Sequence, residues 1–511
     1  MRRRSLLTSA GGDYANQYLT FRAIESGTFR INNNATAFNY SIDSGATWNS
    51  LSSGTSTPTI SAGQTIMWKA TAPSHDQFYG IGRFTSTNKF SVEGNILSLL
   101  WGDDFKGQYV LYGSRYVMKG LFGNCTNLTT AENLEMPATI LRQYAYYQMF
   151  SGCTSLTMPP KVLPAIYLDP YCYYGMFAGC TSLIKVPEIK AEIIAQIDGD
   201  SLSSDCSGCC NSMFDGCTSL TTVPSDLLRP TTMAINAYAY MFRGCTSLTT
   251  TPELLATTLQ TACYRSMFQN CTSLTTAPSL NSTSLATSAY TSMFQSCTSL
   301  TTAPSVLPAT TLQYCCYYNM FYGCSALTTA PSLPATTLQT ACYGYMFYNC
   351  TSLTTAPSLQ ATTLASSCYY GMFRACTSLI TAPELPATTL AYACYFLMFQ
   401  NCSSLTSAPD LPATTLADSC YYEMFEGCTS LTTAPELPAT TLAYECYKYM
   451  FDGCTNLHNI TCLATDISAT NCTNNWVSGV ASTGTFTKAA SMSSWTTGSS
   501  GIPSGWSVQN A

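Results

Sequence analysis

The same order of apolar and polar positions recurs many times between about residues 121 and 457, so this part of the chain is built from one repeated unit. Each copy carries a Met-Phe pair followed by a Cys-Thr-Ser-Leu run, as in Met424 to Leu431. Most copies are 26 to 28 residues apart, with one spacing of 37. A fixed period of this length is typical of a solenoid, in which each unit packs only against its neighbours. The thirteen anchor cysteines are Cys125, Cys153, Cys180, Cys217, Cys245, Cys271, Cys297, Cys324, Cys350, Cys376, Cys402, Cys428 and Cys454.

Within one copy, the spacing of apolar residues predicts a helix with one buried face. In residues 437–463, the recurrent residues fall on one side of a helix that turns 100° per residue, and the variable ones fall on the other. Thr440 and Thr441 are the expected N-caps. Gly in seven copies and Asn in four precede the anchor cysteine, which predicts a left-handed residue that ends the helix. The residues expected on the buried side are Leu442, Cys446, Tyr447, Met450 and Phe451.

A short strand is expected after each anchor cysteine. Leu431 to Pro435 is rich in β-branched residues and closes with a proline that cannot extend a hydrogen-bonded ladder. One helix and one strand per copy, stacked in register, predict an α/β solenoid with a parallel ladder. We therefore expect a leucine-rich-repeat-like right-handed coil of about 13 repeats of about 26 residues.

The cysteines are expected to be reduced and buried. A second cysteine lies eight residues before the anchor in nine copies, and Ala145, Ala237 and Ala289 hold that place in three others. Exchange of Cys for Ala is typical of a small buried position, where a thiol behaves as a compact apolar group. The alternative is a disulfide framework of a secreted protein, since the chain has 27 cysteines.

The two ends of the chain do not repeat. We predict a basic N-terminal arm at residues 1–14, a β-sandwich-like domain at 15–118, the solenoid at 119–457 and a C-terminal cap or interaction tail at 458–511. The arm is interpreted as basic rather than as an export signal, because Thr8 and Ser9 interrupt its apolar run. Ser41 to Trp48 matches the Asp-box pattern Ser-x-Asp-x-Gly-x-Thr-Trp, for which we expect a structural role in a hairpin.

Composition narrows the function. Charged residues make up 9% of the chain and the net charge is -6, without a basic stripe, so nucleic acid is not an expected partner. No apolar run approaches the roughly 18 residues of a membrane span. His75 and His458, the two histidines, lie far apart in sequence, which argues against a histidine-based catalytic site. Cys206 to Cys210 has metal-like spacing, but a second cysteine cluster is not evident, so neither a metal nor another cofactor is expected.

The repeated string Met-Phe-x-Gly-Cys-Thr-Ser-Leu-Thr resembles the BspA-like leucine-rich repeats of bacterial surface proteins and the related repeats of mycoplasma lipoproteins. The resemblance covers residues 121–457 and implies adhesion and recognition rather than catalysis. The chain as a whole, including Tyr18 to Phe21 and Val92 to Asn95, also resembles proteins encoded by tailed phages of gut Bacteroidales. This second resemblance implies a fibre, spike or tail-tip protein.

Two kinds of tyrosine occur in the repeats. One follows the small buried position in eleven of twelve copies, and this regularity favours packing in the core. The others vary from copy to copy, and tyrosine is favoured at binding surfaces. The repeated Thr-Thr pairs form a further array, for which a structural role in hydroxyl ladders is favoured. The candidate recognition surface is made of Tyr174, Tyr318, Tyr370, Tyr392, Tyr422, Tyr444 and Tyr449.

The leading hypothesis is a non-enzymatic virion protein of a tailed phage, assembled in the host cytoplasm. Its N-terminal domain would dock onto other virion proteins, and its solenoid would bind a bacterial surface glycan or protein. A homotrimer fits this hypothesis, because fibres and spikes are commonly trimeric. The alternatives are a BspA-type adhesin on the bacterial cell surface, binding host protein or polysaccharide, and a capsid or tail cement protein without an external ligand.

Overall fold

The computed structural model describes residues 14–32, 38–71, 81–109, 111, 115–192, 207–493 and 495–511. The chain divides into two compact units: unit 1 comprises residues 1–230 and 244–248, and unit 2 comprises residues 231–243 and 249–511. The elements of unit 1 are η1 (Tyr14–Asn16), β1 (Leu19–Ala23), β2 (Phe29–Asn32), β3 (Phe38–Ser41), β4 (Asn49–Leu51), β5 (Thr65–Ala70), β6 (Arg83–Ser86), β7 (Phe90–Asn95), α1 (Ser98–Trp101), η2 (Gly102–Phe105), β8 (Leu128–Glu135), β9 (Ile140–Leu141), β10 (Val162–Leu163), β11 (Tyr167–Leu168) and β12 (Glu188–Ile189). The elements of unit 2 are β13 (Asn459–Cys462), β14 (Thr485–Lys488) and β15 (Ser507–Asn510).

Unit 1 begins with two packed sheets. Six strands lie in the order β4-β3-β5-β1-β7-β8, and β2 pairs with β6 in a second sheet. The ring of Phe21 on β1 lies 5.4 Å from that of Phe29 on β2 and 4.8 Å from that of Phe84 on β6, so aromatic side chains fill the space between the sheets. This two-layer arrangement agrees with the predicted β-sandwich. Its expected boundary at residue 118 stays a prediction.

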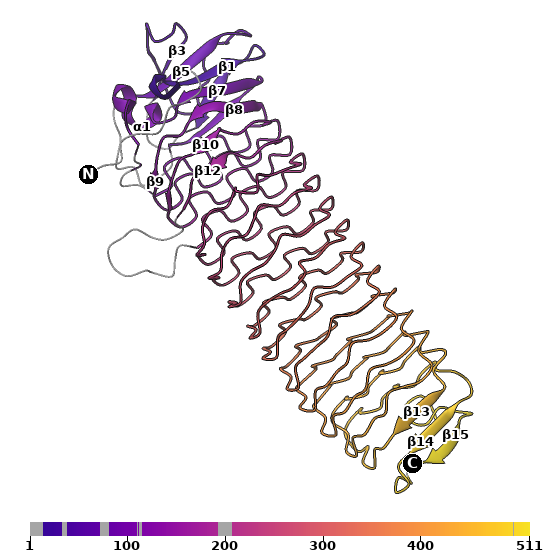
Figure 1. Cartoon of the computed structure of the whole chain (residues 1–511). Helices are drawn as coiled ribbons and strands as arrows, with labels where there is room; N and C mark the ends of the chain where they lie inside the picture. Colours follow the sequence, from indigo (N-terminus) through magenta and orange to yellow (C-terminus); the bar gives the residue numbers. More distant parts are fainter. Residues whose placement is uncertain are drawn as a thin grey trace. The chain divides into compact units, whose positions relative to one another are not determined.

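The first sheet continues into the solenoid. β8, which follows the first anchor cysteine, pairs in parallel with β7, whereas β1, β3 and β5 pair antiparallel (Figure 1). Phe122, from the first copy of the repeat, lies 5.8 Å from Phe84 and 5.9 Å from Phe21. The core of the repeats in unit 1 is therefore continuous with the core of the sandwich.

The Asp box has the structural role expected of it. The Asp43 carboxylate accepts hydrogen bonds from the Thr47 backbone amide at 2.9 Å and from the Thr47 hydroxyl at 2.6 Å, while Gly45 donates to Ser41 Oγ. Hydrogen bonds from Ser41 and Thr47 lower the pKa of Asp43 to about 2. These contacts close the hairpin between β3 and β4.

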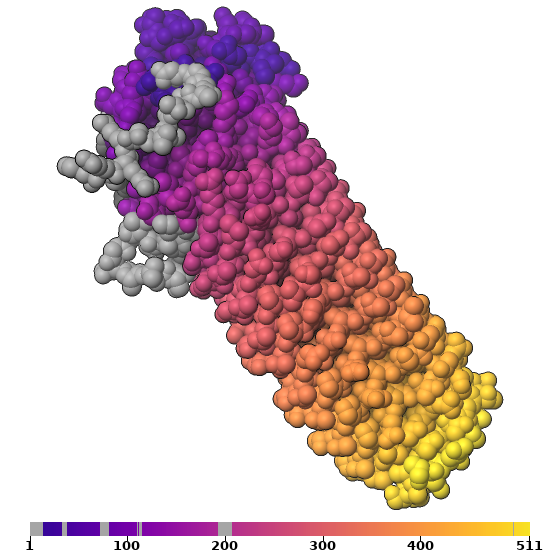
Figure 2. Space-filling view, viewed as in Figure 1, coloured from indigo at the N-terminus to yellow at the C-terminus, as the bar shows by residue number. Residues whose placement is uncertain are grey.

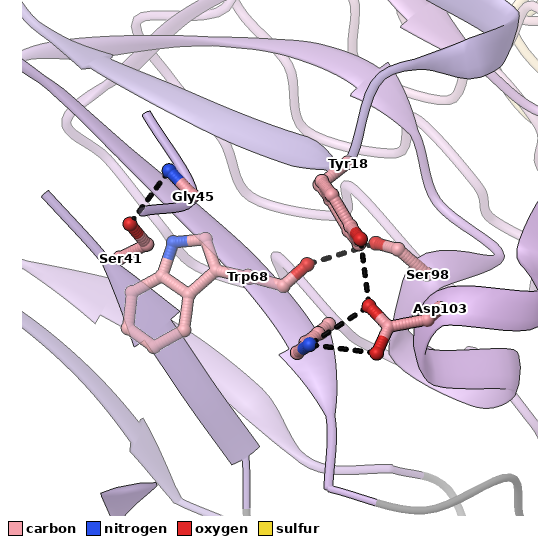
Figure 3. A network of polar contacts seen from close by, with 7 residues as sticks. Tyr18, Ser41, Gly45, Trp68, Ser98 and Asp103 are labelled. Carbon is pink, nitrogen blue, oxygen red and sulfur yellow. Dashed lines mark hydrogen bonds and ion pairs between the residues drawn. The ribbon is translucent and has the colours of Figure 1, made fainter. Parts of the chain in front are cut away.

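A second polar network ties the short helix η2 to the first sheet. Figure 3 shows the Tyr18 hydroxyl donating to Asp103, and Ser98 Oγ donating to the Trp68 carbonyl oxygen. The first of these bonds measures 2.6 Å. The Lys69 ammonium donates to both carboxylate oxygens of Asp103, at 2.7 and 2.9 Å. Asp103 on η2 thus accepts hydrogen bonds from Tyr18 and from Lys69 on β5, which fixes η2 against the first sheet.

Stacked ladders of identical side chains form the core of both units, and successive coils lie side by side in each (Figure 1). In unit 1 the rings of Phe122, Phe150, Phe177 and Phe214 stack 5.3 to 5.5 Å apart. In unit 2 the phenylalanine ladder runs from Phe242 to Phe451. The regular tyrosines form a parallel ladder and are at most 2% exposed, which confirms the predicted packing role. The predicted solenoid is thereby confirmed.

The predicted helix in each repeat is wrong. The ten residues before each anchor cysteine form a chain of overlapping turns, here called the turn segment; residues 444–453 are one example. In it, Cys446, Lys448 and Met450 donate to the carbonyl three residues back, while the amides between them donate to the next coil, as Tyr447 does to Cys472 at 2.9 Å. Among the described residues the only α-helix is α1. Thr441, expected as an N-cap, instead forms a parallel bridge to Asp466.

Left-handed residues explain why the turn segment is not a helix. Glu445, Tyr449 and Gly453 have φ of 50°, 54° and 71°, and this spacing of four residues recurs in the other coils. A regular α-helix needs φ near −63° throughout. The position before the anchor cysteine has positive φ in all thirteen copies, including Ser296 and Ala375. The predicted left-handed conformation is therefore confirmed, although it closes a turn rather than a helix.

The predicted strand appears as a parallel bridge in most coils of unit 2. Thr355 bridges Thr381 in the next coil, and Thr381 in turn bridges Ser407. The proline two residues later lacks an amide donor, so the ladder stays short. In some coils a threonine hydroxyl of this segment donates to the preceding coil, as Thr301 Oγ1 does to Thr275 O at 3.2 Å, which agrees with the predicted structural role.

The cysteines occupy the small buried positions that were predicted. Cys172 and Cys446 are fully buried, and so are Ala145 and Ala289 at the equivalent places. Each anchor thiol after the first donates a hydrogen bond to the carbonyl of the phenylalanine one coil earlier, as Cys454 does to Phe425 at 3.0 Å. A free thiol supplies this donor, and a disulfide sulfur does not.

Residues after 457 follow the same path without the repeat motif. β13, β14 and β15 form a parallel sheet at the end of unit 2 (Figure 1). The ring of Trp476 lies 6.1 Å from Tyr447 and 6.3 Å from Phe451, and Trp495 stacks on its other side at 5.7 Å. Trp476 thus covers the last rings of both ladders. The interpretation of residues 458–511 as a cap or as an interaction tail stays a prediction.

Candidate recognition surface

The turn segments present one outward face to solvent. In the coil ending at Cys454, the side chains of Cys446, Met450 and Phe451 point into the core, whereas Tyr444 and Tyr449 lie on the outside. Residues 26 apart occupy the same position in successive coils of this region, so each outward position becomes a column. Figure 2 shows the coils of unit 2 as adjacent bands of side chains, which lets neighbouring columns build one surface.

An aromatic row follows two neighbouring outward columns of unit 2. The rings of Tyr370 and Phe396 stack 4.8 Å apart, and those of Phe396 and Tyr422 stack 4.3 Å apart, both within 6° of parallel. At either end the contact becomes edge-to-face, at 4.9 Å from Tyr345 to Tyr370 and 6.1 Å from Tyr422 to Tyr449. The outer aromatic row, as we call it, comprises Tyr318, Tyr345, Tyr370, Phe396, Tyr422 and Tyr449.

Two glycines make room for this row. A Cβ at Gly371 would lie 2.5 Å from the Tyr345 ring, and one at Gly344 would lie 2.8 Å from the Tyr318 ring. Gly371 also has a φ of 55°, a conformation that glycine adopts without a steric penalty. The positions of these two tyrosines therefore depend on the absence of a neighbouring side chain.

Ring orientation decides what the row offers a partner. In the stack of Tyr370, Phe396 and Tyr422, neighbouring rings cover one another's faces, so only ring edges and the two hydroxyls face solvent. Tyr392 and Tyr444 differ: they are 59% and 45% exposed, and within the described part of the chain their rings contact no other aromatic ring. Their faces are free to stack on a ligand.

A polar column flanks the aromatic row. The Arg374 guanidinium lies 5.1 Å from the centre of the Tyr348 ring, a cation–π geometry. In the next coil, Gln400 is buried and its amide nitrogen donates to Glu423 at 2.8 Å and to Glu426 at 2.5 Å. A positive group and two carboxyl groups thus lie two coils apart along one side of the row, with Gln400 in the coil between them.

The Glu423 carboxyl beside Gln400 lies next to a second carboxyl, that of Glu426. Burial, and then the adjacent Glu426 carboxyl, raise the pKa of Glu423 to about 7. Two carboxylates this close do not both ionise readily, because their charges repel. The charge of this side of the surface therefore changes near neutral pH.

A lysine holds the other end of the row. The Lys448 ammonium lies 5.3 Å from the centre of the Tyr422 ring and 5.8 Å from that of Tyr449, and it pairs with Glu445 at 2.8 Å. Contact with Glu445 raises the pKa of Lys448. The ammonium therefore stays charged against the aromatic rings at neutral pH.

The structure brings only some of the predicted tyrosines together. Tyr318, Tyr370, Tyr422 and Tyr449 lie in the outer aromatic row. Tyr392 and Tyr444 share a separate exposed column, and Tyr174, in unit 1, stacks on Tyr147 at 4.9 Å. Whether any of them binds a ligand stays a prediction.

Sequence reasoning missed Tyr345 and Phe396, and it also missed the polar residues beside them, which include Arg374 and Glu423. Tyr345 and Phe396 occupy variable positions of the repeat, and this variability was the available signal. The polar residues gave none, because their neighbours in space come from coils 26 residues away in sequence.

The described residues hold no group of three or more metal-ligating side chains. Cys209 and Cys210 of the metal-like sequence are buried in the core, and Cys206 lies outside the described residues. His75, too, is outside them. No helix within the described ranges is long and apolar enough to cross a membrane.

A family model and solved structures of other proteins match this chain. The model of the BspA-type leucine-rich repeat region matches residues 196–328, 309–407 and 395–475. A leucine-rich repeat protein from Bacteroides ovatus is a structural match with a TM-score of 0.33 and 15% identity, covering 75% of this chain and 84% of that one. Another, from Eubacterium ventriosum, has a TM-score of 0.25 and 17% identity, with coverage of 68% and 91%. No curated protein matches by sequence.

Proposed function

The chain belongs to the BspA-type leucine-rich repeat family, and from that premise we propose that it is a non-catalytic recognition protein whose outward face binds a surface polysaccharide. The observation that carries this proposal is the pair Tyr392 and Tyr444, exposed at the same position of coils two apart. At about 4.8 Å per coil, the two rings are spaced roughly 10 Å along the stack, which is close to the length of a disaccharide unit.

The chemistry of the surface supports a sugar ligand. A free tyrosine face offers apolar contact to the C–H groups of a sugar ring, and its hydroxyl offers a hydrogen bond. Only 9% of the residues are charged, so the surface does not require a strongly charged partner. The repeated coils would follow a repeating polymer, with each coil contributing the same kind of contact.

The test is binding of the full chain to arrays of bacterial and host polysaccharides. We expect the double variant Tyr392→Ala and Tyr444→Ala to lose at least tenfold in affinity, since both ring faces are removed. Val306→Ala, at an exposed apolar position outside the turn segments, is the matched control and should bind normally. Unchanged glycan binding by the double variant would refute the proposal.

A protein ligand is the second candidate, favoured by the outer aromatic row. The row presents ring edges beside Arg374 and Glu423, and aromatic residues together with arginine are enriched at protein interfaces. In that case Arg374→Ala and Tyr422→Ala would abolish capture of a host surface protein, while the double variant at Tyr392 and Tyr444 would retain it.

We further propose that the protein is a virion component of a tailed phage, with the cell-surface adhesin as the alternative. Buried thiols that donate hydrogen bonds support folding in a reducing cytoplasm, where virions assemble. Docking onto other virion proteins and assembly as a homotrimer belong to the same proposal. Co-purification with phage particles would support it, and recovery only from the bacterial cell surface would support the adhesin.

A further inference from the structure

A polar cleft in unit 1 shares no residue with the outward face of unit 2. It has a volume of about 280 Å³. Small-molecule pockets commonly measure about 300–1,000 Å³, so this cleft is matched to a ligand the size of one sugar residue. Glycines leave part of its wall without side chains, including Gly120 and Gly123. The side chains that line it are Asn32, Arg83, Lys119, Asn124, Gln148 and Ser151.

The cleft is positively charged. Arg83 and Lys119 both line it, and the lining contains no carboxylate. Neither cation pairs with a carboxylate of the described residues. The chain has 27 Asp and Glu residues but only 21 Lys and Arg residues. Two cations without acidic partners at one concave site are therefore unusual for this chain. A negatively charged group of a ligand would neutralise the charge of these two cations.

Aromatic rings position one of the two cations. The Lys119 ammonium lies 4.9 Å from the centre of the Tyr116 ring and 5.2 Å from that of Tyr147. These rings are in turn stacked, Tyr116 on Tyr144 at 4.4 Å and Tyr147 on Tyr174 at 4.9 Å. The ammonium is therefore held by neutral partners, which leave its full charge for a ligand.

Neutral polar groups complete the lining. The Asn32 side-chain oxygen accepts from Arg30 Nε at 2.9 Å, which leaves its amide nitrogen as a donor. The Asn124 side chain lies over Gly152, where an added Cβ would come 2.2 Å from Asn124 Oδ1. Gln148 and Ser151 add further donors and acceptors. Amides and hydroxyls of this kind match the hydroxyl groups of a sugar.

We propose that this cleft binds one acidic sugar residue, with its carboxylate held by Arg83 and Lys119 and its hydroxyls held by Asn32, Asn124 and Gln148. Arginine suits this task because its planar guanidinium can bond both carboxylate oxygens. The site is independent of the outward face of unit 2 and of the proposal made for it.

The proposal is tested by calorimetric titration of the full chain with glucuronate, with neutral glucose and with inorganic sulfate. We expect glucuronate to bind at least tenfold more tightly than either of the others, and added salt to weaken its binding. Arg83→Gln and Lys119→Gln should each reduce glucuronate affinity at least tenfold. Lys89→Gln, at an exposed cation that pairs with Glu25, is the matched control and should bind as the wild type does.

Three results would overturn the proposal: no glucuronate binding, equal binding of inorganic sulfate, or glucuronate binding that survives both substitutions. Circular dichroism of each variant checks that it folds, and both altered side chains are exposed at the surface. The double variant at Tyr392 and Tyr444 should bind glucuronate normally. A failure of the polysaccharide proposal is thereby separated from a failure of this one.

Discussion

The Cys402 thiol donates a hydrogen bond to the carbonyl oxygen of Phe373, 3.0 Å away and one coil earlier in the solenoid. Burial raises the pKa of Cys402 to about 12, and a buried neutral thiol reacts slowly because the thiolate is the nucleophile. The same bond recurs along both units, so the cysteines are protected as a group.

We therefore predict that thiol-specific reagents leave the anchor cysteines unmodified in the folded protein. Among the cysteines that the structure describes, Cys315, which is half-buried, should react first, and Cys315→Ala should remove that reaction. Peptide mapping by mass spectrometry identifies each modified site, and protein unfolded in guanidinium is the control. Rapid modification of Cys402 in the folded state would contradict the prediction.

The left-handed position before the anchor cysteine predicts whether each of two substitutions raises or lowers the free energy of unfolding. Ala375 has a φ of 55°, where a side chain costs about 1 kcal/mol relative to glycine. Ala375→Gly should therefore raise the free energy of unfolding by about that amount, and Gly453→Ala should lower it similarly. Denaturant unfolding measures both. A destabilising Ala375→Gly would show that the left-handed strain is not the dominant effect there.

The outer aromatic row predicts a larger cost at Gly371. A Cβ there meets both an unfavourable φ and the Tyr345 ring at 2.5 Å. Gly371→Ala should thus destabilise the protein by more than about 2 kcal/mol, because steric overlap adds to backbone strain. Gly453→Ala is the control for strain alone, since its added Cβ would lie 3.7 Å from Gly427. Equal losses of unfolding free energy at Gly371 and Gly453 would mean that the Tyr345 ring moves aside without an energetic cost.

The carboxyl pair at Glu423 and Glu426 predicts a pH dependence. Burial and Glu426 raise the pKa of Glu423 to about 7, above its ordinary 4.5, so the folded state binds more protons than the unfolded state between these values. The contribution of Glu423 is therefore most favourable below about pH 4.5 and is lost as the pH rises through 7.

The comparison is made with Glu423→Gln, which should lack this contribution. Unfolding free energies of the two proteins, measured from pH 5 to pH 8, give the contribution of Glu423 as their difference. Carboxyls with lowered pKa, such as Asp103, act in the opposite direction in acid but cancel in that difference. A difference that does not change with pH would show that Glu423 titrates normally.

The repeat sequence predicted the stacking of coils but not the backbone of the turn segment. Cys446, Tyr447, Met450 and Phe451 are buried as expected. The turn segment repeats every four residues, so its side chains rotate by about 90° per residue, whereas those of a helix rotate by about 100°. From Cys446 to Phe451 the two geometries therefore differ by about 50°, which is less than the width of the apolar face of a helix. Side-chain burial alone therefore does not distinguish them. The left-handed Glu445 and Tyr449 carried no signal, because neither residue type favours that conformation.

The sequence predicted only part of the candidate surface, because residues that are neighbours in space there are far apart in the sequence. Variation from copy to copy identified Tyr318, Tyr370 and Tyr422, and all three lie in one row. The position of Tyr318 depends on Gly344 in the next coil, a neighbour that only the register of the coils brings close. The cleft around Lys119 was not foreseen, since its residues come from the sandwich and from two different coils.

Every second amide of the turn segment donates across to the following coil, so each coil meets identical partners before and behind it. Deleting or duplicating 26 residues would join two equivalent positions and leave both ladders unbroken, whereas a change of 25 would turn core side chains outward. The length of this protein can therefore change only in steps of one whole coil. Recombination between near-identical copies would lengthen or shorten the molecule by whole coils, changing its reach without a new core having to evolve.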